Sequence, residues 1–120
     1  LFVNAIGAMP KGGQLTIRTR REQWPSSNFP ADHLPGQFAT GDELVVAEVD
    51  DTGTGIPEEY LRRVFDPFFT TKPVGVGTGL GLSVARRIID LHGGSITIRN
   101  RSQGGVRVTL ILKVNSTQLL

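Results

Sequence analysis

Apolar residues at the start of the chain recur with the spacing of a helix. Leu1, Ala5 and Ala8 fall on one helical face. Pro10 and a pair of glycines follow, and neither residue type continues a helix. We therefore expect a first helix that ends near Met9.

Further along, apolar and polar residues alternate with the period of a β-strand. This pattern predicts strands at 14–20, 43–51, 95–101 and 106–114, the last two joined by a turn at 103–105. The residues expected to face the interior are Leu15, Ile17 and Thr19 in the first strand and Leu44, Val46 and Val49 in the second.

Two more helices are expected between the second and third strands. Pro57 followed by Glu58 and Glu59 opens a short one, because proline suits the first helical position and acids suit the positive end. The other covers 82–92 and stops at a glycine pair. Its expected buried face consists of Val84, Ala85, Ile88 and Ile89.

Residues 21–42 are rich in proline, glycine and polar side chains, which indicates a long surface loop. We expect its Trp24, Phe29 and Phe38 to pack onto the body of the protein. The order of elements predicts an α+β fold, a two-layer α/β sandwich whose mixed, mostly antiparallel sheet carries helices on one face. The expected domain covers 1–114, with a tail at 115–120.

Composition narrows the class of protein without identifying it. A chain of 120 residues, 38% hydrophobic and 20% charged, suits one globular domain. It has no cysteine, which excludes disulfides and thiolate metal sites. A net charge of +2 with scattered basic residues does not indicate nucleic-acid binding. No apolar run approaches the roughly 20 residues of a membrane span.

The stretch DTGTGIP (51–57) ends a strand with one carboxylate and two nearby glycines. Gly53 can let a flat ligand lie against the backbone, and Asp51 can accept a hydrogen bond from the amino group of adenine. The same residues also suit an ordinary turn in which Asp51 binds neighbouring amides. Taken alone, this stretch leaves both interpretations open.

A second glycine-rich stretch, GTGLGL (77–82), leads into the helix at 82–92. Its amides and the helix N-terminus can hold a phosphate, although a flexible connector has the same composition. It is neither a dinucleotide fingerprint nor a Walker loop, since GxGxxG and the GK[ST] ending are missing.

Four single residues have less certain chemistry. Asn4 offers an amide oxygen that suits Mg²⁺ beside phosphate oxygens, though a lone helical asparagine is more often solvated. Lys72 either contacts phosphate or is solvated, and His33 and His92 are interpreted as structural. The sequence shows no Ser-His-Asp set, acid pair or metal-ligand cluster.

Four stretches in this order resemble the catalytic and ATP-binding domain of two-component sensor histidine kinases. They are LFVNAIGAM (1–9), DDTGTGIP (50–57), FDPFFTTK (65–72) and GTGLGL (77–82), which resemble the asparagine box, first glycine box, phenylalanine box and second glycine box. The resemblance runs from Leu1 to about Val114 and is strongest to the nitrogen-regulation type. Gyrase, the mismatch-repair ATPases and the large heat-shock chaperone share this fold.

The resemblance implies ATP and Mg²⁺ as cofactors. Asn4 would be the catalytic residue and would coordinate the Mg²⁺ that bridges the phosphates. Asp51 would bind the adenine amino group, while Gly53 and Gly55 would make room for the base. The implied nucleotide-binding set is Asn4, Ala8, Asp51, Gly53, Gly55, Ile56, Phe69, Thr71, Lys72, Gly77, Thr78, Gly79, Leu80, Gly81 and Leu82.

The resemblance also implies a mobile ATP lid over residues 66–78. Phe65, Phe68 and Phe69 would fix one end of it to the body, while the glycines in its middle would let it open and close. A lid that admits nucleotide and then excludes water needs both properties.

The implied reaction transfers the ATP γ-phosphate to a histidine on a separate helical dimerisation domain, from which a response-regulator receiver domain takes it. Neither His33 nor His92 lies in a helical acceptor motif. The resemblance implies a cytoplasmic domain with no nucleic-acid partner and no direct membrane contact. Because the chain begins inside its first helix, we expect an N-terminally truncated domain that is incomplete as an isolated enzyme.

Two alternatives remain open. One is a nucleotide-binding or protein-interaction module without kinase activity. The other is a serine/threonine kinase of the anti-sigma type, which shares the fold and a similar lid. The intact GTGLGL stretch and the HGG turn at 92–94 favour the sensor kinase.

Overall fold

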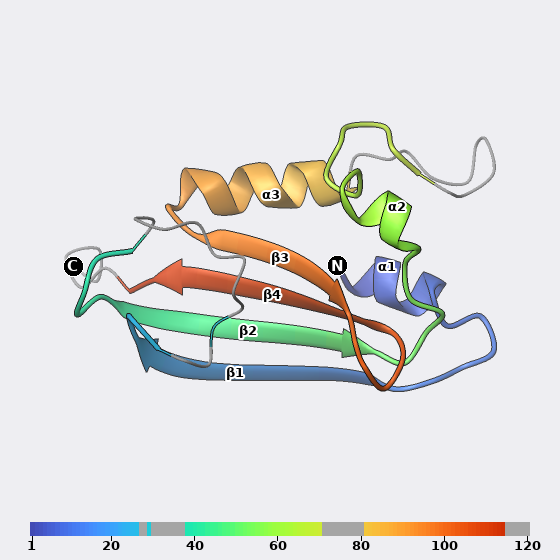
Figure 1. Ribbon diagram of the computed structural model, residues 1–120, viewed down its shortest axis with the longest axis horizontal. Helices are drawn as coiled ribbons and strands as arrows, with labels where there is room; N and C mark the ends of the chain where they lie inside the picture. Colours follow the sequence, from blue (N-terminus) through green and yellow to red (C-terminus); the bar gives the residue numbers. More distant parts are fainter. Residues whose placement is uncertain (27–28, 30–37, 71–80, 115–120) are drawn as a thin grey trace.

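One antiparallel sheet of four strands organises the structure, a computed structural model that describes residues 1–26, 29, 38–70 and 81–114. The strands lie in the order β1-β2-β4-β3 (Figure 1). Their bounds are Leu15–Gln23 for β1, Glu43–Asp51 for β2, Ser95–Asn100 for β3 and Val106–Lys113 for β4. The helices are α1 (Phe2–Gly7), α2 (Glu58–Leu61) and α3 (Gly81–Leu91). Each expected element is present within a few residues of its expected bounds.

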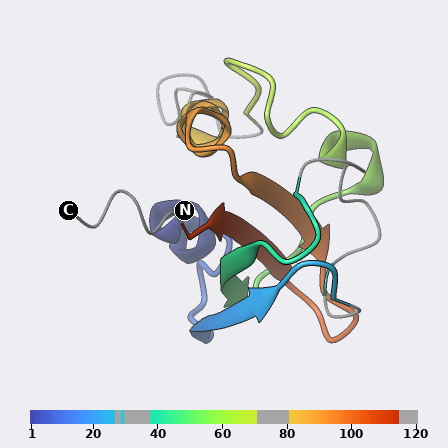
Figure 2. The ribbon, with the colours of Figure 1, turned by 90° about the vertical axis from the view of Figure 1, so that its left-hand side faces the viewer.

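Helices α1 and α3 lie on the same side of the sheet (Figure 2). Helix α1, in which Ala5 is buried, lies against β2, and α3 lies against β3. The predicted two-layer α+β fold with helices on one face is therefore confirmed. Its sheet was expected to be mixed and mostly antiparallel, and the strands of the described residues pair only in the antiparallel sense.

A cluster of buried apolar residues lies on the other face of the sheet, away from these helices. Leu44, Val46 and Ile111 are fully buried there, together with Phe38. Trp24 and Phe29 pack against this cluster, with the ring centroid of Trp24 5.3 Å from that of Phe29 and 5.5 Å from that of Phe38. The prediction that these three aromatic residues hold the loop onto the body is confirmed.

Strand β2 is buried on both faces over residues 49–51, whereas Val45 near its start is exposed. Leu44 and Val46 point toward the aromatic cluster, whereas Val49, also buried, points toward the helices because side chains alternate along a strand. The interior placement predicted for all three residues is confirmed.

Two predictions of burial are wrong. Ile17 on β1 is 49% exposed and Thr19 is also exposed, since β1 is the edge strand and the helices lie against β2 and β3. On α3, Val84 and Ile88 are 50% and 49% exposed, while Ala85 and Ile89 are partly buried. The apolar face of α3 is therefore wider than the part of the helix that lies against the sheet.

Candidate functional site

The candidate site lies at the end of the sheet where β2 finishes. The C-terminal end of β2, helix α1, the start of α3 and the turn between β3 and β4 all lie at this end of the molecule (Figure 1). The structure thus brings the first glycine-rich stretch (51–57) beside the end of α1; it is here called the nucleotide loop, after the role that the resemblance implies for it. The N-terminal end of the helix that follows GTGLGL lies at the same end of the fold.

Asp51 is buried, with only 5% of its surface exposed. Its Oδ1 accepts hydrogen bonds from the amides of Gly53 (2.9 Å) and Val106 (3.1 Å). No other described residue donates to Oδ2, so that oxygen can accept a hydrogen bond from a ligand. The turn interpretation and the ligand interpretation are therefore compatible, since each uses a different oxygen.

Gly53 is required by the packing of α1 against the nucleotide loop. A Cβ at this position would lie 2.4 Å from the carbonyl oxygen of Ala8, a backbone atom that cannot move easily. The same oxygen accepts a hydrogen bond from the Thr54 amide at 3.3 Å. The close neighbour that excludes a side chain here is the end of α1, and contact of Gly53 with a base remains a prediction.

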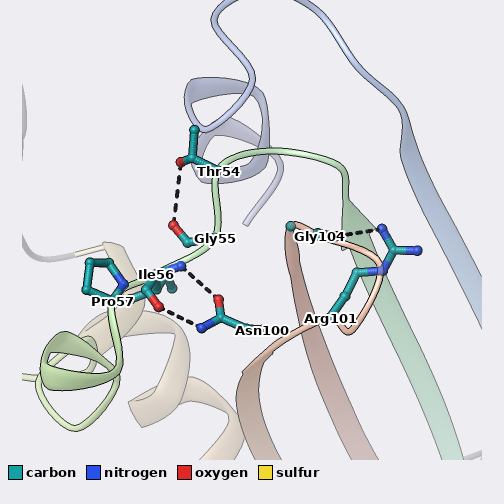
Figure 3. Close-up of a pocket in the computed structure, with 8 residues that line it drawn as sticks. Thr54, Gly55, Ile56, Pro57, Asn100, Arg101 and Gly104 are labelled. Atoms are coloured by element: carbon teal, nitrogen blue, oxygen red, sulfur yellow. Dashed lines mark hydrogen bonds between the residues drawn. The ribbon is translucent and has the colours of Figure 1, made fainter.

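The nucleotide loop is also tied to the end of β3. The Ile56 amide donates to Oδ1 of Asn100 at 2.7 Å, and Nδ2 of Asn100 donates to the Ile56 carbonyl at 2.6 Å (Figure 3). Gly55 has a left-handed backbone (φ 79°), and a Cβ there would lie 3.0 Å from Oδ1 of Asn100.

A hollow of about 310 Å³ lies between the loop and the β3–β4 turn. It is lined by Thr54, Gly55, Ile56, Pro57, Asn100, Arg101, Gly104 and Gly105. Sequence reasoning missed the role of Asn100 because nothing in the sequence pairs it with a residue 44 positions away.

Asp50, the neighbour of Asp51, lies in a cluster of arginines. It is only 2% exposed and receives two hydrogen bonds from Arg107, at 2.7 and 2.8 Å, and one from Arg18 at 3.0 Å. The Arg107 hydrogen bonds, helped by Arg18 and by the charge of Arg101, hold the pKa of Asp50 below its ordinary value. The hydrogen bonds between Arg107 and Asp50 also raise the pKa of Arg107. Sequence reasoning also missed this cluster.

Arg101 connects the two aspartates. Its Nη1 donates to the backbone carbonyl of Asp51 at 2.9 Å and to that of Gly104 at 3.1 Å, and its Nε lies 3.7 Å from Oδ2 of Asp50. The β3–β4 turn therefore fixes the backbone of Asp51 as well as its carboxylate.

Asn4 is exposed on α1, and its side chain binds no other described residue. Within the described part of the chain, no group of three or more His, Cys, Asp or Glu residues can hold a metal ion. One free amide oxygen fits Mg²⁺ that takes its other ligands from phosphates and water, which is how this ion is commonly bound.

Phenylalanines of the third motif differ in their packing. Phe69 contacts Tyr60, with ring centroids 5.6 Å apart, and the guanidinium of Arg63 lies 4.7 Å from its ring. Arg86 lies 5.0 Å from the ring of Phe65. Phe68 has a left-handed backbone (φ 67°) and is 71% exposed, so the prediction that its ring packs onto the body is wrong.

Of the predicted phosphate-binding residues, the structure describes the last two. Gly81 and Leu82 form the first turn of α3. Thr71, Lys72, Gly77, Thr78, Gly79 and Leu80 lie outside the described residues, as does most of the predicted lid. No helix in the described ranges has the length and apolar character needed to cross a bilayer.

Comparison with known proteins gives the family. The sequence profile described as "Histidine kinase-, DNA gyrase B-, and HSP90-like ATPase" matches residues 1–116. The chain is 52% identical over 99 residues to the sensor kinase CckA of Brucella abortus (strain 2308); the aligned residues cover 80% of this chain and 10% of that protein. It is 33% identical over 118 residues to the sensor histidine kinase ZraS of Salmonella typhi, covering 98% and 21%.

A solved structure, the catalytic domain of histidine kinase ThkA, matches with a TM-score of 0.65 and 32% identity, covering 93% of this chain and 58% of that one. The chain spans about a tenth of CckA and a fifth of ZraS. These matches confirm the resemblance drawn from the four motifs, and the match to ZraS supports the nitrogen-regulation-like type. The chain belongs to the histidine kinase-, DNA gyrase B- and HSP90-like ATPase family, and the relatives that it matches are sensor kinases.

Proposed function

We propose that this chain is the ATP-binding catalytic domain of a sensor histidine kinase. It transfers the γ-phosphate of ATP to a histidine on a separate helical dimerisation domain, and a response-regulator receiver domain then takes the phosphate. The family profile and the named relatives support this proposal. A cytoplasmic location, where ATP is available, belongs to the same proposal.

The arrangement of Asp51 carries the proposal. Its buried carboxylate is held by two backbone amides on Oδ1, which leaves Oδ2 as an acceptor. Adenine offers an amino proton at the corresponding edge, whereas guanine and hypoxanthine offer a carbonyl oxygen that the carboxylate repels. The site therefore favours ATP over GTP, since the wrong base leaves a buried charge without a donor.

The proposed Mg²⁺ site is the free amide oxygen of Asn4. When bound, Mg²⁺ neutralises charge on the phosphate oxygens. The chain itself holds the nucleotide in place: Asp51 binds the base, and Gly77, Gly79 and Gly81 with the N-terminus of α3 bind the phosphates. For phosphoryl transfer, positioning and electrostatics supply most of the catalysis.

Calorimetric titration with ADP, with and without Mg²⁺, tests the nucleotide site. Asp51→Asn should weaken ADP binding by at least about 1.5 kcal/mol, because a charge-assisted hydrogen bond at a buried site is lost. The asparagine can still accept both backbone amides through its oxygen, so the fold should persist. Asp90→Asn is the control, since Asp90 is exposed on α3 and lies 4.0 Å from Arg86. Equal ADP affinity in unaltered and Asp51→Asn protein would rule out the adenine assignment.

A phosphorylation assay separates the kinase from its alternatives. The chain is incubated with labelled ATP and, separately, with helical protein substrates that carry a histidine or a serine acceptor. Label that appears on the histidine substrate and is lost in acid supports the histidine kinase. Acid-stable label on the serine substrate would instead favour the anti-sigma type. Nucleotide binding without transfer to either substrate would favour a binding module.

A further inference from the structure

Asn100 makes with the backbone of Ile56, in the nucleotide loop, the pair of hydrogen bonds that a neighbouring strand would otherwise make. Its Oδ1 accepts from the Ile56 amide at 2.7 Å, and its Nδ2 donates to the Ile56 carbonyl at 2.6 Å. A carboxamide is suited to this pairing because it carries a donor and an acceptor side by side. Asn100 thus satisfies both backbone groups of Ile56 with one side chain (Figure 3).

This contact is the main brace of the second half of the loop. In the described ranges, the only other hydrogen bond from residues 55–57 to a strand or helix is the one that the Tyr60 amide of α2 donates to the Pro57 carbonyl at 2.9 Å. The first half is held separately, by Thr54 to Ala8 and by Asp51 to Val106. Without Asn100, the loop would be fixed at its start and would next be held at α2.

The backbone beside Ile56 is shaped for the same contact. Gly55 adopts φ 79°, and any Cβ there would lie 3.0 Å from Oδ1 of Asn100, closer than most real contacts. The glycine therefore permits both the turn and the approach of the carboxamide. Its partner, Asn100, lies at the end of β3, a fixed element of the sheet.

We propose that Asn100 is a positioning residue for nucleotide binding: it holds Ile56 in place so that the loop is already ordered when a purine nucleotide arrives. This inference rests on the proposed function. A loop ordered in advance loses less conformational entropy on binding, which strengthens affinity without any contact to the ligand. Because Asp51 is held independently by Val106 and Arg101, removal of Asn100 should leave base preference unchanged.

The test combines affinity, base preference and hydrogen exchange. Asn100→Ala should weaken binding of ADP about tenfold, which is near the lower end of the range expected when two ordinary hydrogen bonds are lost. The affinity of this variant for inosine diphosphate, which lacks the adenine amino group, should fall by the same factor, so the ratio of the two affinities stays constant. Without nucleotide, the Ile56 amide should exchange hydrogen faster, while amides in the centre of β2 keep their protection.

Two further variants sharpen the test. Asn100→Asp has the same shape and keeps the acceptor for the Ile56 amide, but it removes the donor, so ADP affinity should also fall. This variant replaces Asn100→Ala in the test if Asn100→Ala folds poorly. Ser102→Ala is the control in the same turn, since Ser102 is exposed and, among the described residues, its side chain hydrogen-bonds only to that of Gln103. Its ADP affinity should equal that of the unaltered chain.

Two results would overturn the inference. Unchanged ADP affinity in Asn100→Ala, with Ile56 exchanging faster, would mean that the brace exists but does not assist binding. A changed ratio of ADP to inosine diphosphate affinity would mean that Asn100 acts through Asp51 or contacts the base. If the unaltered chain binds no ADP, the proposed function fails and this inference with it, while the exchange of Ile56 still reports whether the brace exists.

Discussion

Replacing Asp50 by asparagine tests how much of the stability depends on the arginine cluster. Asp50 is almost completely buried and accepts three hydrogen bonds from arginine side chains. Asparagine has nearly the same shape but carries no charge and turns an NH₂ group toward a guanidinium. The substitution therefore removes the electrostatic part of the cluster and leaves its packing in place.

The expected cost follows from the exposure of the partners. Breaking a fully buried ion pair costs about 3–5 kcal/mol, because the remaining charge is stranded away from water. Here Arg107 and Arg18 keep 40% and 56% of their side-chain surface exposed, so water can solvate them when the carboxylate is gone. We therefore expect Asp50→Asn to lower the free energy of unfolding by about 2 kcal/mol.

Urea denaturation at several pH values measures this cost and its electrostatic origin. The folded-state pKa of Asp50 is depressed by the Arg107 hydrogen bonds, so its charge stabilises the fold above the unfolded-state pKa of about 3.9. That contribution disappears as the pH falls through the lower folded-state pKa. The difference in the free energy of unfolding between unaltered and Asp50→Asn protein should thus be largest near pH 7 and should shrink in acid.

The control is Glu43→Gln, which removes the partner of Arg21 in an exposed pair and should change stability by less than about 1 kcal/mol. If Asp50→Asn costs no more than this control near neutral pH, the burial and bonding of Asp50 do not stabilise the fold. A large cost that stays constant down to pH 2 would mean that shape, and not charge, causes it.

Two further predictions concern packing. Gly53→Ala should lower the free energy of unfolding by about 1–3 kcal/mol in urea denaturation, because its methyl group would lie 2.4 Å from the Ala8 carbonyl oxygen; a neutral effect would mean that α1 can shift freely. Ile111→Ala should cost roughly 3 kcal/mol by the same measurement, since Ile111 is fully buried, whereas Ile88→Ala on the half-exposed face of α3 should cost less than about 1 kcal/mol; equal costs would contradict the assigned burial.

Local chemistry explains which parts of the fold could be predicted. Alternation along 43–51 and the glycine pair after α3 act over a few residues, so the sequence alone located β2 and the end of α3. The aromatic residues of the long loop had few other places to be buried, and their packing was also predicted. Asp51 could be singled out as a candidate because a carboxylate between a strand and a glycine turn is a local pattern, but that pattern left the turn interpretation open, and binding of adenine stays a prediction.

Predictions that depended on distant neighbours were less successful. Ile17 and Ile88 have the spacing of buried residues, yet their exposure depends on which elements cover them, and periodicity carries no such information. Asn100 and the partners of Asp50 lie on other strands, so their roles depend on the register of the sheet. Burial and long-range pairing are tertiary properties, whereas a single sequence mainly reports local ones.

The adjacent positions of Asp50 and Asp51 make the alignment of the strands a condition for the base recognition proposed for Asp51. Side chains alternate along β2, so Asp50 faces the arginines and Asp51 faces the opposite side. A slip of β2 by one residue would move one carboxylate to the position of the other and carry the second carboxylate away from its partners. On the role proposed for Asp51, an insertion or deletion of a single residue within β2 would then weaken nucleotide binding even with every motif residue still present. A sequence can thus keep its four motifs and still lose the site.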